Sequence, residues 1–141
     1  MTSIVDAGPL VTTAENSSPE AMRIRATMLA ERGPLIVPAT VTAEVDYLLS
    51  KLDTGRSQAA FVRDFAEGRL QAECLERAEY AIVLQLGERY RDLRPGLADL
   101  SIVVLAHRFR THRIITSDQR HFRAMTAIDG KPFTLLPWDE A

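Results

Sequence analysis

Cysteine, aromatic side chains and long apolar runs are scarce in this chain of 141 residues. Cys74 is the single cysteine, which excludes an internal disulfide and a zinc site built from cysteines. No apolar run approaches the roughly 20 residues of a membrane-spanning helix, and the first residues lack the basic and apolar regions of a signal peptide. We therefore expect a cytoplasmic protein that does not bind a membrane.

The remaining composition is ordinary for a globular protein. Hydrophobic residues make up 46% of the chain and charged residues 26%, which excludes a chain that is disordered throughout. A protein of this length can bury about two thirds of its unfolded surface in one core. Since no repeat, low-complexity segment or linker interrupts the sequence, residues 1–141 are expected to form a single domain.

Short apolar runs alternate with helical patterns along the chain. The strands are expected at residues 2–6, 35–37, 69–74, 113–116 and 132–136. Helices are expected at 19–32, 41–52, 57–67, 75–90, 97–109 and 117–125, with Thr40 as the N-cap of the second, and only a brief turn or helix is expected after Gly8-Pro9. This alternation predicts an α/β fold, a three-layer α/β/α sandwich whose central sheet has four to five mainly parallel strands.

Four carboxylates lie where a predicted strand ends or a predicted helix begins. They are Asp6, Glu44, Asp99 and Asp118. Because the carboxyl ends of parallel strands and the starts of the following helices share one edge of the sheet, these side chains should converge there. Neighbouring unpaired carboxylates repel one another, so the cluster implies a bound cation or a shared proton. Oxygen ligands suit Mg²⁺ or Mn²⁺, and the shortage of histidine and cysteine argues against zinc.

Each acid also has a plainer interpretation. Asp6 and Asp118 could cap the segments that follow them, and Glu44 and Asp99 could interact favourably with helix dipoles. Glu44 and Asp99 are nevertheless unusual, because apolar neighbours at helical spacing place them on or beside a buried stripe. An unpaired carboxylate in such a position costs several kcal/mol and therefore needs a partner.

Three polar neighbours of Asp118 could belong to the same site. The hydroxyl groups of Thr116 and Ser117 could hold a metal-bound water or orient the carboxylate. His121 follows Asp118 by one helical turn and could approach the site, although a surface position is expected for it. The three histidines match no H-E-x-x-H zinc spacing.

Positive charge is concentrated in one segment, although the net charge is only -2. Residues 107–123 contain five arginines and three histidines but one acid, Asp118. Such a segment could attract a polyanion. Arg108, Arg113 and Arg120 are accordingly the candidate residues for binding a polyanion, and the alternative is an ordinary solvated surface.

Four motifs contain the acids: VDAGPLV at 5–11, TAEVDYLL at 42–49, LADLSIVVLA at 97–106 and TSDQRHF at 116–122. In this order they resemble the motifs of PIN-domain ribonucleases, and more narrowly those of the VapC toxins of bacterial type II toxin-antitoxin pairs. The resemblance covers nearly the whole chain. Many relatives have a hydroxyl residue directly after the first aspartate, where this chain has Ala7, so a hydrogen bond from that position must come from elsewhere.

The resemblance implies a PIN-like sandwich with one or two Mg²⁺ or Mn²⁺ ions held by Asp6, Glu44, Asp99 and Asp118. It also implies RNA cleavage, homodimerisation, and inhibition by a cognate VapB-like antitoxin whose C-terminal segment covers the site. The polyanion expected at Arg108, Arg113 and Arg120 would then be RNA, which makes these the candidate RNA-binding residues. The expected function is thus that of a metal-dependent endoribonuclease toxin acting on structured RNA, such as a loop of tRNA or rRNA.

Proteins of other classes fit less well. Receiver domains and haloacid-dehalogenase phosphatases also gather aspartates at strand ends, but Asp6-Ala7-Gly8 lacks the acidic pair of the first and the D-x-D of the second. No G-x-G-x-x-G follows a strand, which excludes a dinucleotide-binding domain. A degenerate PIN-like scaffold or nucleic-acid-binding module without catalysis is the remaining alternative. The presence of an acid at all four positions argues against it.

Overall fold

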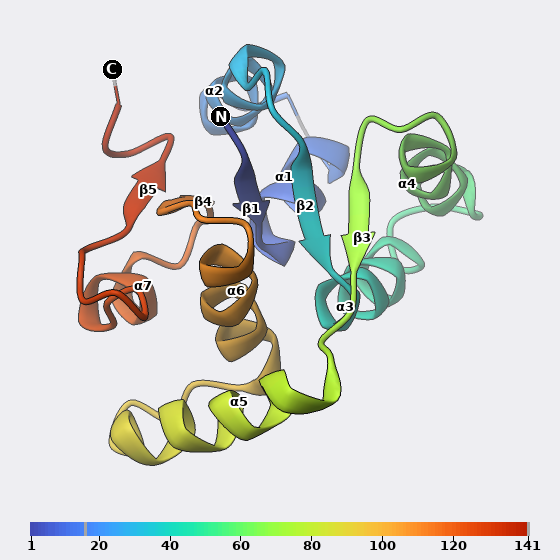
Figure 1. Ribbon diagram of the computed structural model, residues 1–141. Helices are drawn as coiled ribbons and strands as arrows, with labels where there is room; N and C mark the ends of the chain where they lie inside the picture. Colours follow the sequence, from blue (N-terminus) through green and yellow to red (C-terminus); the bar gives the residue numbers. More distant parts are fainter. Residues whose placement is uncertain (16, 141) are drawn as a thin grey trace.

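The computed structural model describes residues 1–15 and 17–140, in which five short strands form one sheet (Figure 1). The strands are β1 (Ser3–Val5), β2 (Leu35–Pro38), β3 (Gln71–Glu73), β4 (Arg113–Ile115) and β5 (Thr134–Leu136). Their order in the sheet is β3-β2-β1-β4-β5, and every pairing is parallel. The expected parallel sheet is therefore confirmed, and each of the five strands overlaps a range expected from the sequence.

Helices cover both faces of this sheet. They are α1 (Ala7–Glu15), α2 (Pro19–Ala30), α3 (Ala39–Leu49), α4 (Arg56–Ala66), α5 (Arg77–Arg89), α6 (Leu97–Arg108) and α7 (Gln119–Ala124). The chain moves from β1 outward to β3 and then returns to β4 and β5, so right-handed crossovers place α1 to α4 on one face and α5 to α7 on the other. In agreement, α1 packs against α2 and α3, whereas α5 packs against α6. These are the three layers of the expected sandwich.

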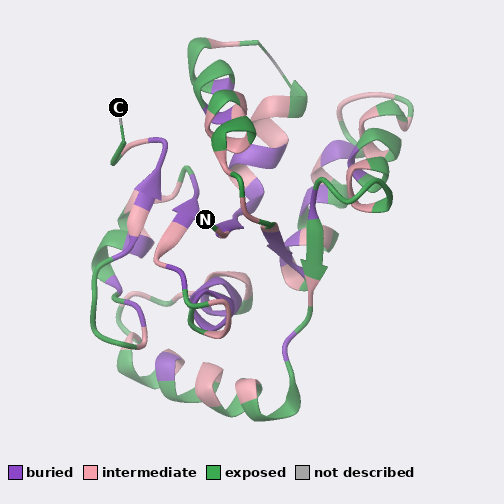
Figure 2. Cartoon of the chain, turned by 45° about the horizontal axis from the view of Figure 1, so that its top comes forward, coloured by how far each residue is buried: buried purple, intermediate pink, exposed green. Residues whose placement is uncertain are grey.

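The core is densest where α6 crosses the sheet. All seven residues from Leu100 to Ala106 are buried, because α6 packs on β1, β2 and β4 from one side and on α5 from another (Figure 2). A helix that is apolar nearly all round is stable only in such a position. Within the described part of the chain, none of the helices has the length and apolar character that crossing a lipid bilayer demands.

The helices expected from residues 75 and 117 begin two residues later, as α5 and α7, and two other expected starts are wrong for a structural reason. Gly8-Pro9 does not delay α1, which begins at Ala7 and is separated from β1 by Asp6 alone. A proline is tolerated in a first helical turn because the N–H groups there have no partner within the helix. In the second case α3 begins at Ala39 with Pro38 as its N-cap, since β2 continues into the helix without a loop. Thr40 therefore lies inside the first turn, and its buried hydroxyl oxygen has no hydrogen-bond partner among the described residues.

Candidate active site

The four predicted acids meet at the edge of the sheet where β1 and β4 end. Asp6 is the residue after β1, and Asp118 follows β4 and caps α7. Asp99 lies in the first turn of α6, and Glu44 lies in the middle of α3. One open hollow is lined by Asp6, Ala7, Gly8, Glu44, Ala98, Asp99, Ser117 and Asp118. Residues far apart in the sequence are thus brought together as the parallel topology predicts.

Asp6 is the most deeply buried of the four, with 9% of its surface exposed. Its Oδ1 accepts a hydrogen bond of 2.8 Å from the backbone N–H of Ala7, and its Oδ2 accepts one of 2.8 Å from the hydroxyl of Thr116. Burial nevertheless raises the pKa of this carboxyl to about 6, and the nearby charges of Asp99 and Glu44 act in the same direction. A site with this arrangement favours a cation.

Thr116 connects two of the acids. While its hydroxyl donates to Asp6, the same oxygen accepts a hydrogen bond of 2.9 Å from the backbone N–H of Asp118. Its carbonyl accepts one of 2.7 Å from the indole of Trp138. Thr116 therefore fixes the chain between β4 and α7, and it supplies the side-chain hydrogen bond that Ala7 cannot make.

Ser117 lines the hollow without holding an acid in place. Its side chain is exposed and makes no hydrogen bond to the described residues. The segment approaches α1 closely, because a Cβ placed on Gly8 would lie 3.3 Å from both Cβ and Oγ of Ser117. Gly8 thus permits the close contact between α1 and the segment after β4, and both Gly8 and Ser117 line the hollow.

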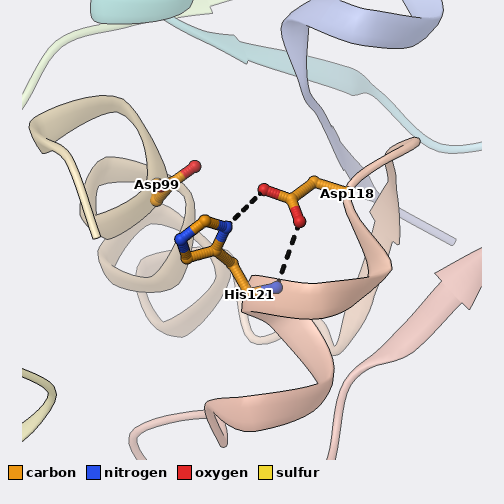
Figure 3. Close-up of side chains that lie close together, drawn as sticks. All are labelled: Asp99, Asp118 and His121. Atoms are coloured by element: carbon orange, nitrogen blue, oxygen red, sulfur yellow. Dashed lines mark hydrogen bonds and ion pairs between the residues drawn. The ribbon is translucent and has the colours of Figure 1, made fainter. Parts of the chain in front are cut away.

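Asp99, Asp118 and His121 form the tightest cluster at this edge (Figure 3). Each offers one potential ligand atom, and these atoms all lie within 4.8 Å of one another. Asp118 accepts from the backbone N–H of His121 at 3.1 Å and from its ring Nδ1 at 2.7 Å. Burial raises the pKa of Asp99, with a further rise caused by Asp118. The expectation of a surface position for His121 is therefore wrong, because the first turn of α7 directs its ring at the acids.

Glu44 differs from the other three acids in being exposed. The sequence places it on or beside the buried stripe of α3, but only its neighbours Val41 and Val45 are buried. Its carboxylate faces the hollow and makes no hydrogen bond or ion pair with the described residues. It is thus available to a ligand in the hollow.

The candidate RNA-binding arginines do not lie together. Arg108 ends α6, about 14 Å along the helix axis from Asp99 at about 1.5 Å per residue. Its guanidinium is paired with Glu79 and, at 3.2 Å, with Glu73. These carboxylates come from β3 and α5, which the charge pattern of a single segment cannot reveal.

Arg113 also lies away from the hollow, at the amino end of β4. It pairs with Glu31 and Glu140, and the hydrogen bonds that it donates to Glu140 and Glu31 raise its pKa. Arg120 is the exception among the three: it is exposed, lies in the first turn of α7 two residues after Asp118, and has no ion pair with the described residues. Of the three candidates, Arg120 is therefore the one whose guanidinium is not neutralised by a carboxylate of the described residues.

Residues 3–127 of the chain match the family model of the PIN domain. Ribonuclease VapC26 of Mycobacterium tuberculosis (strain ATCC 25618 / H37Rv) is 32% identical over 134 residues, which are 95% of this chain and 99% of that relative. The crystal structure of VapC20 from Mycobacterium tuberculosis, a Sarcin-Ricin loop cleaving toxin, superposes with a TM-score of 0.73 and covers 85% of this chain and 92% of that one. At 9% identity this second likeness concerns the fold alone.

Proposed function

Because this chain belongs to the PIN-domain family, we propose that it is an endoribonuclease of the VapC type, the toxin of a toxin-antitoxin pair. Its substrate is a structured RNA, such as a loop of tRNA or rRNA, in which it hydrolyses phosphodiester bonds. The observation that carries this proposal is the convergence of Asp6, Glu44, Asp99 and Asp118 on one open hollow. The degenerate scaffold is disfavoured, because four capping acids would have no reason to share a site.

The donor set of the hollow fits a divalent cation. Carboxylate oxygens are the ligands of Mg²⁺ and Mn²⁺, and Asp99 and Asp118 already lie close enough to share one ion. We propose that these two, with Asp6 and Glu44, hold Mg²⁺ or Mn²⁺. When bound, such an ion supplies an activated water and offsets the charge of the phosphate.

The remaining residues of the site position these acids and the RNA. Thr116 holds the carboxylate of Asp6 in a fixed orientation by its hydrogen bond, and Ser117 can contact a phosphate or a water at the rim. Arg120 provides a positive charge beside a site that is otherwise negative, which would attract the RNA backbone. Arg108 and Arg113 could contact phosphates only by giving up their carboxylate partners, so Arg120 carries this part of the proposal.

We further propose the partners that follow from this family. A VapB-like antitoxin would cover the hollow with its C-terminal segment, and basic side chains in that segment would complement the four acids. A homodimer is proposed as well, since Tyr80 and Leu84 expose large apolar side chains one turn apart on α5. We place the protein in the cytoplasm with its RNA substrate, as one domain spanning residues 1–141.

Sequencing of RNA 5′ ends after brief induction of the protein tests the function and identifies the substrate. The wild-type chain should stop growth and create new 5′ ends at one or a few positions. Asp99→Asn should create none, whereas Asp92→Asn should act as the wild type, because Asp92 is exposed in the turn after α5 and has no partner among the described residues. Harmless expression of folded wild-type protein, with an unchanged RNA population, would contradict the proposal.

A further inference from the structure

His121 is the polar side chain of the site that the four-acid arrangement leaves without a role. Its imidazole lies between the carboxylates of Asp99 and Asp118 in Figure 3, and ligand atoms of the three residues lie within 4.8 Å of one another. Two ligands on opposite sides of an octahedral ion, each at about 2.1 Å, are about 4.2 Å apart. Asp99 and the imidazole are therefore close enough to share one ion, while Asp118 is hydrogen-bonded to the other side of the ring.

The two nitrogens of this ring have different tasks. Nδ1 lies 2.7 Å from Oδ2 of Asp118, and a carboxylate can only accept, so Nδ1 carries the hydrogen. Nε2 then has a free lone pair, and it makes no hydrogen bond to the described residues. A histidine whose one nitrogen donates to a carboxylate while the other is free to bind an ion has the arrangement typical of metal-ligating histidines.

We propose that His121 is a metal ligand through Nε2, and that the site consequently prefers Mn²⁺ to Mg²⁺. Mg²⁺ takes oxygen ligands almost entirely, whereas an imidazole nitrogen adds affinity for transition-metal ions. Asp118 has a second function in this arrangement, because it orients the imidazole as well as contributing charge. The inference rests on the proposed metal-dependent function and adds a fifth residue and a metal preference to it.

Replacing His121 by Asn separates ligation from positioning. The amide nitrogen of Asn can take the place of Nδ1 and keep the hydrogen bond to Asp118, but Asn has no counterpart of Nε2. His112→Asn is the matched control, because His112 forms a similar pair with Asp129, also at 2.7 Å, away from the hollow. Both variants lose one imidazole from a histidine-aspartate pair, and only one loses it from the site.

Pulsed electron paramagnetic resonance of bound Mn²⁺ detects a nitrogen ligand directly, because a coordinated nitrogen modulates the electron spin echo. The wild type and His112→Asn should show the nitrogen modulation, and His121→Asn should lack it. Calorimetric titration should find Mn²⁺ binding at least about tenfold weaker in His121→Asn, with Mg²⁺ binding nearly unchanged. Nitrogen modulation that persists in His121→Asn, or is absent from the Mn²⁺-bound wild type, would overturn the proposal.

The outcomes distinguish this inference from the function on which it rests. If Mn²⁺ binds without nitrogen modulation and RNA is still cleaved, the function stands and His121 is only a positioning residue. If the modulation is present but no RNA is cleaved, the ligand assignment stands and the proposed nuclease function is wrong. If neither Mn²⁺ nor Mg²⁺ binds the wild type, both proposals are wrong.

Discussion

Replacing Asp6 by Asn should stabilise the metal-free protein at neutral pH, whereas altering a buried polar residue usually destabilises a fold. Burial raises the pKa of this carboxyl from 3.8 to about 6, so the native state binds its proton more tightly than the unfolded chain does. Each tenfold difference in proton affinity corresponds to about 1.4 kcal/mol. Ionised Asp6 therefore lowers the free energy of unfolding by about 3 kcal/mol at neutral pH.

The sign of this effect fixes the pH range in which it is seen. Below pH 3.8 the carboxyl is protonated in both states and the stabilisation is fully present. It is lost as the pH rises through about 6, where the native carboxyl ionises. Asn resembles the protonated carboxyl in having one donor side and one acceptor side, so the variant should not show this loss.

Urea unfolding in EDTA, measured between pH 4 and pH 8, provides the assay. The two proteins should have similar free energies of unfolding near pH 4, and Asp6→Asn should be more stable by about 3 kcal/mol near pH 8. Asp92→Asn, which changes an exposed aspartate in the same way, should follow the wild type at every pH. A difference between Asp6→Asn and the wild type that does not change with pH would refute the raised pKa.

Three further substitutions test the neighbours of the site. Arg120→Gln should reduce the slope of log K for RNA against log salt by about 1 without changing stability, and an unchanged slope would mean that Arg120 contacts no phosphate. Arg113→Gln should instead destabilise the fold by about 3 kcal/mol, because it leaves the carboxylate of Glu31 buried with its main partner removed. Urea unfolding would show this loss, and an unchanged unfolding midpoint would contradict it. Thr116→Val removes the hydrogen bond that lowers the pKa of Asp6, so titration followed by carbon NMR should find that carboxyl ionising at higher pH, and a lower value would contradict the account.

The sheet and the convergence of the acids could be predicted because they depend on local patterns and on a topological rule. The apolar run of residues 100–106 predicts a buried helix, and α6 is buried along that stretch. Parallel strands bring Asp6 and Asp118 to one edge wherever the strands end, so their meeting does not depend on details of packing.

The structure weakens the expectations for two arginines, because their carboxylate partners come from distant parts of the chain. Arg113 reads as a surface cation, but the fold supplies Glu31 from 82 residues away and neutralises it. Arg108 is neutralised by Glu79, 29 residues away, for the same reason. His121 is a different case. Its spacing of three residues from Asp118, which caps the helix, was enough to predict that its ring lies beside that carboxylate.

Thermal melting of the wild type and Asp99→Asn, each in EDTA and in Mn²⁺, tests most directly whether the converged acids hold a cation. Asn keeps the shape of the side chain and relieves repulsion with Asp118, so the metal-free variant should be at least as stable as the wild type. Mn²⁺ should raise the melting temperature of the wild type by mass action and have little effect on the variant. Equal responses to Mn²⁺ in the two proteins would contradict the metal site, because Asp99 would then serve only its own helix.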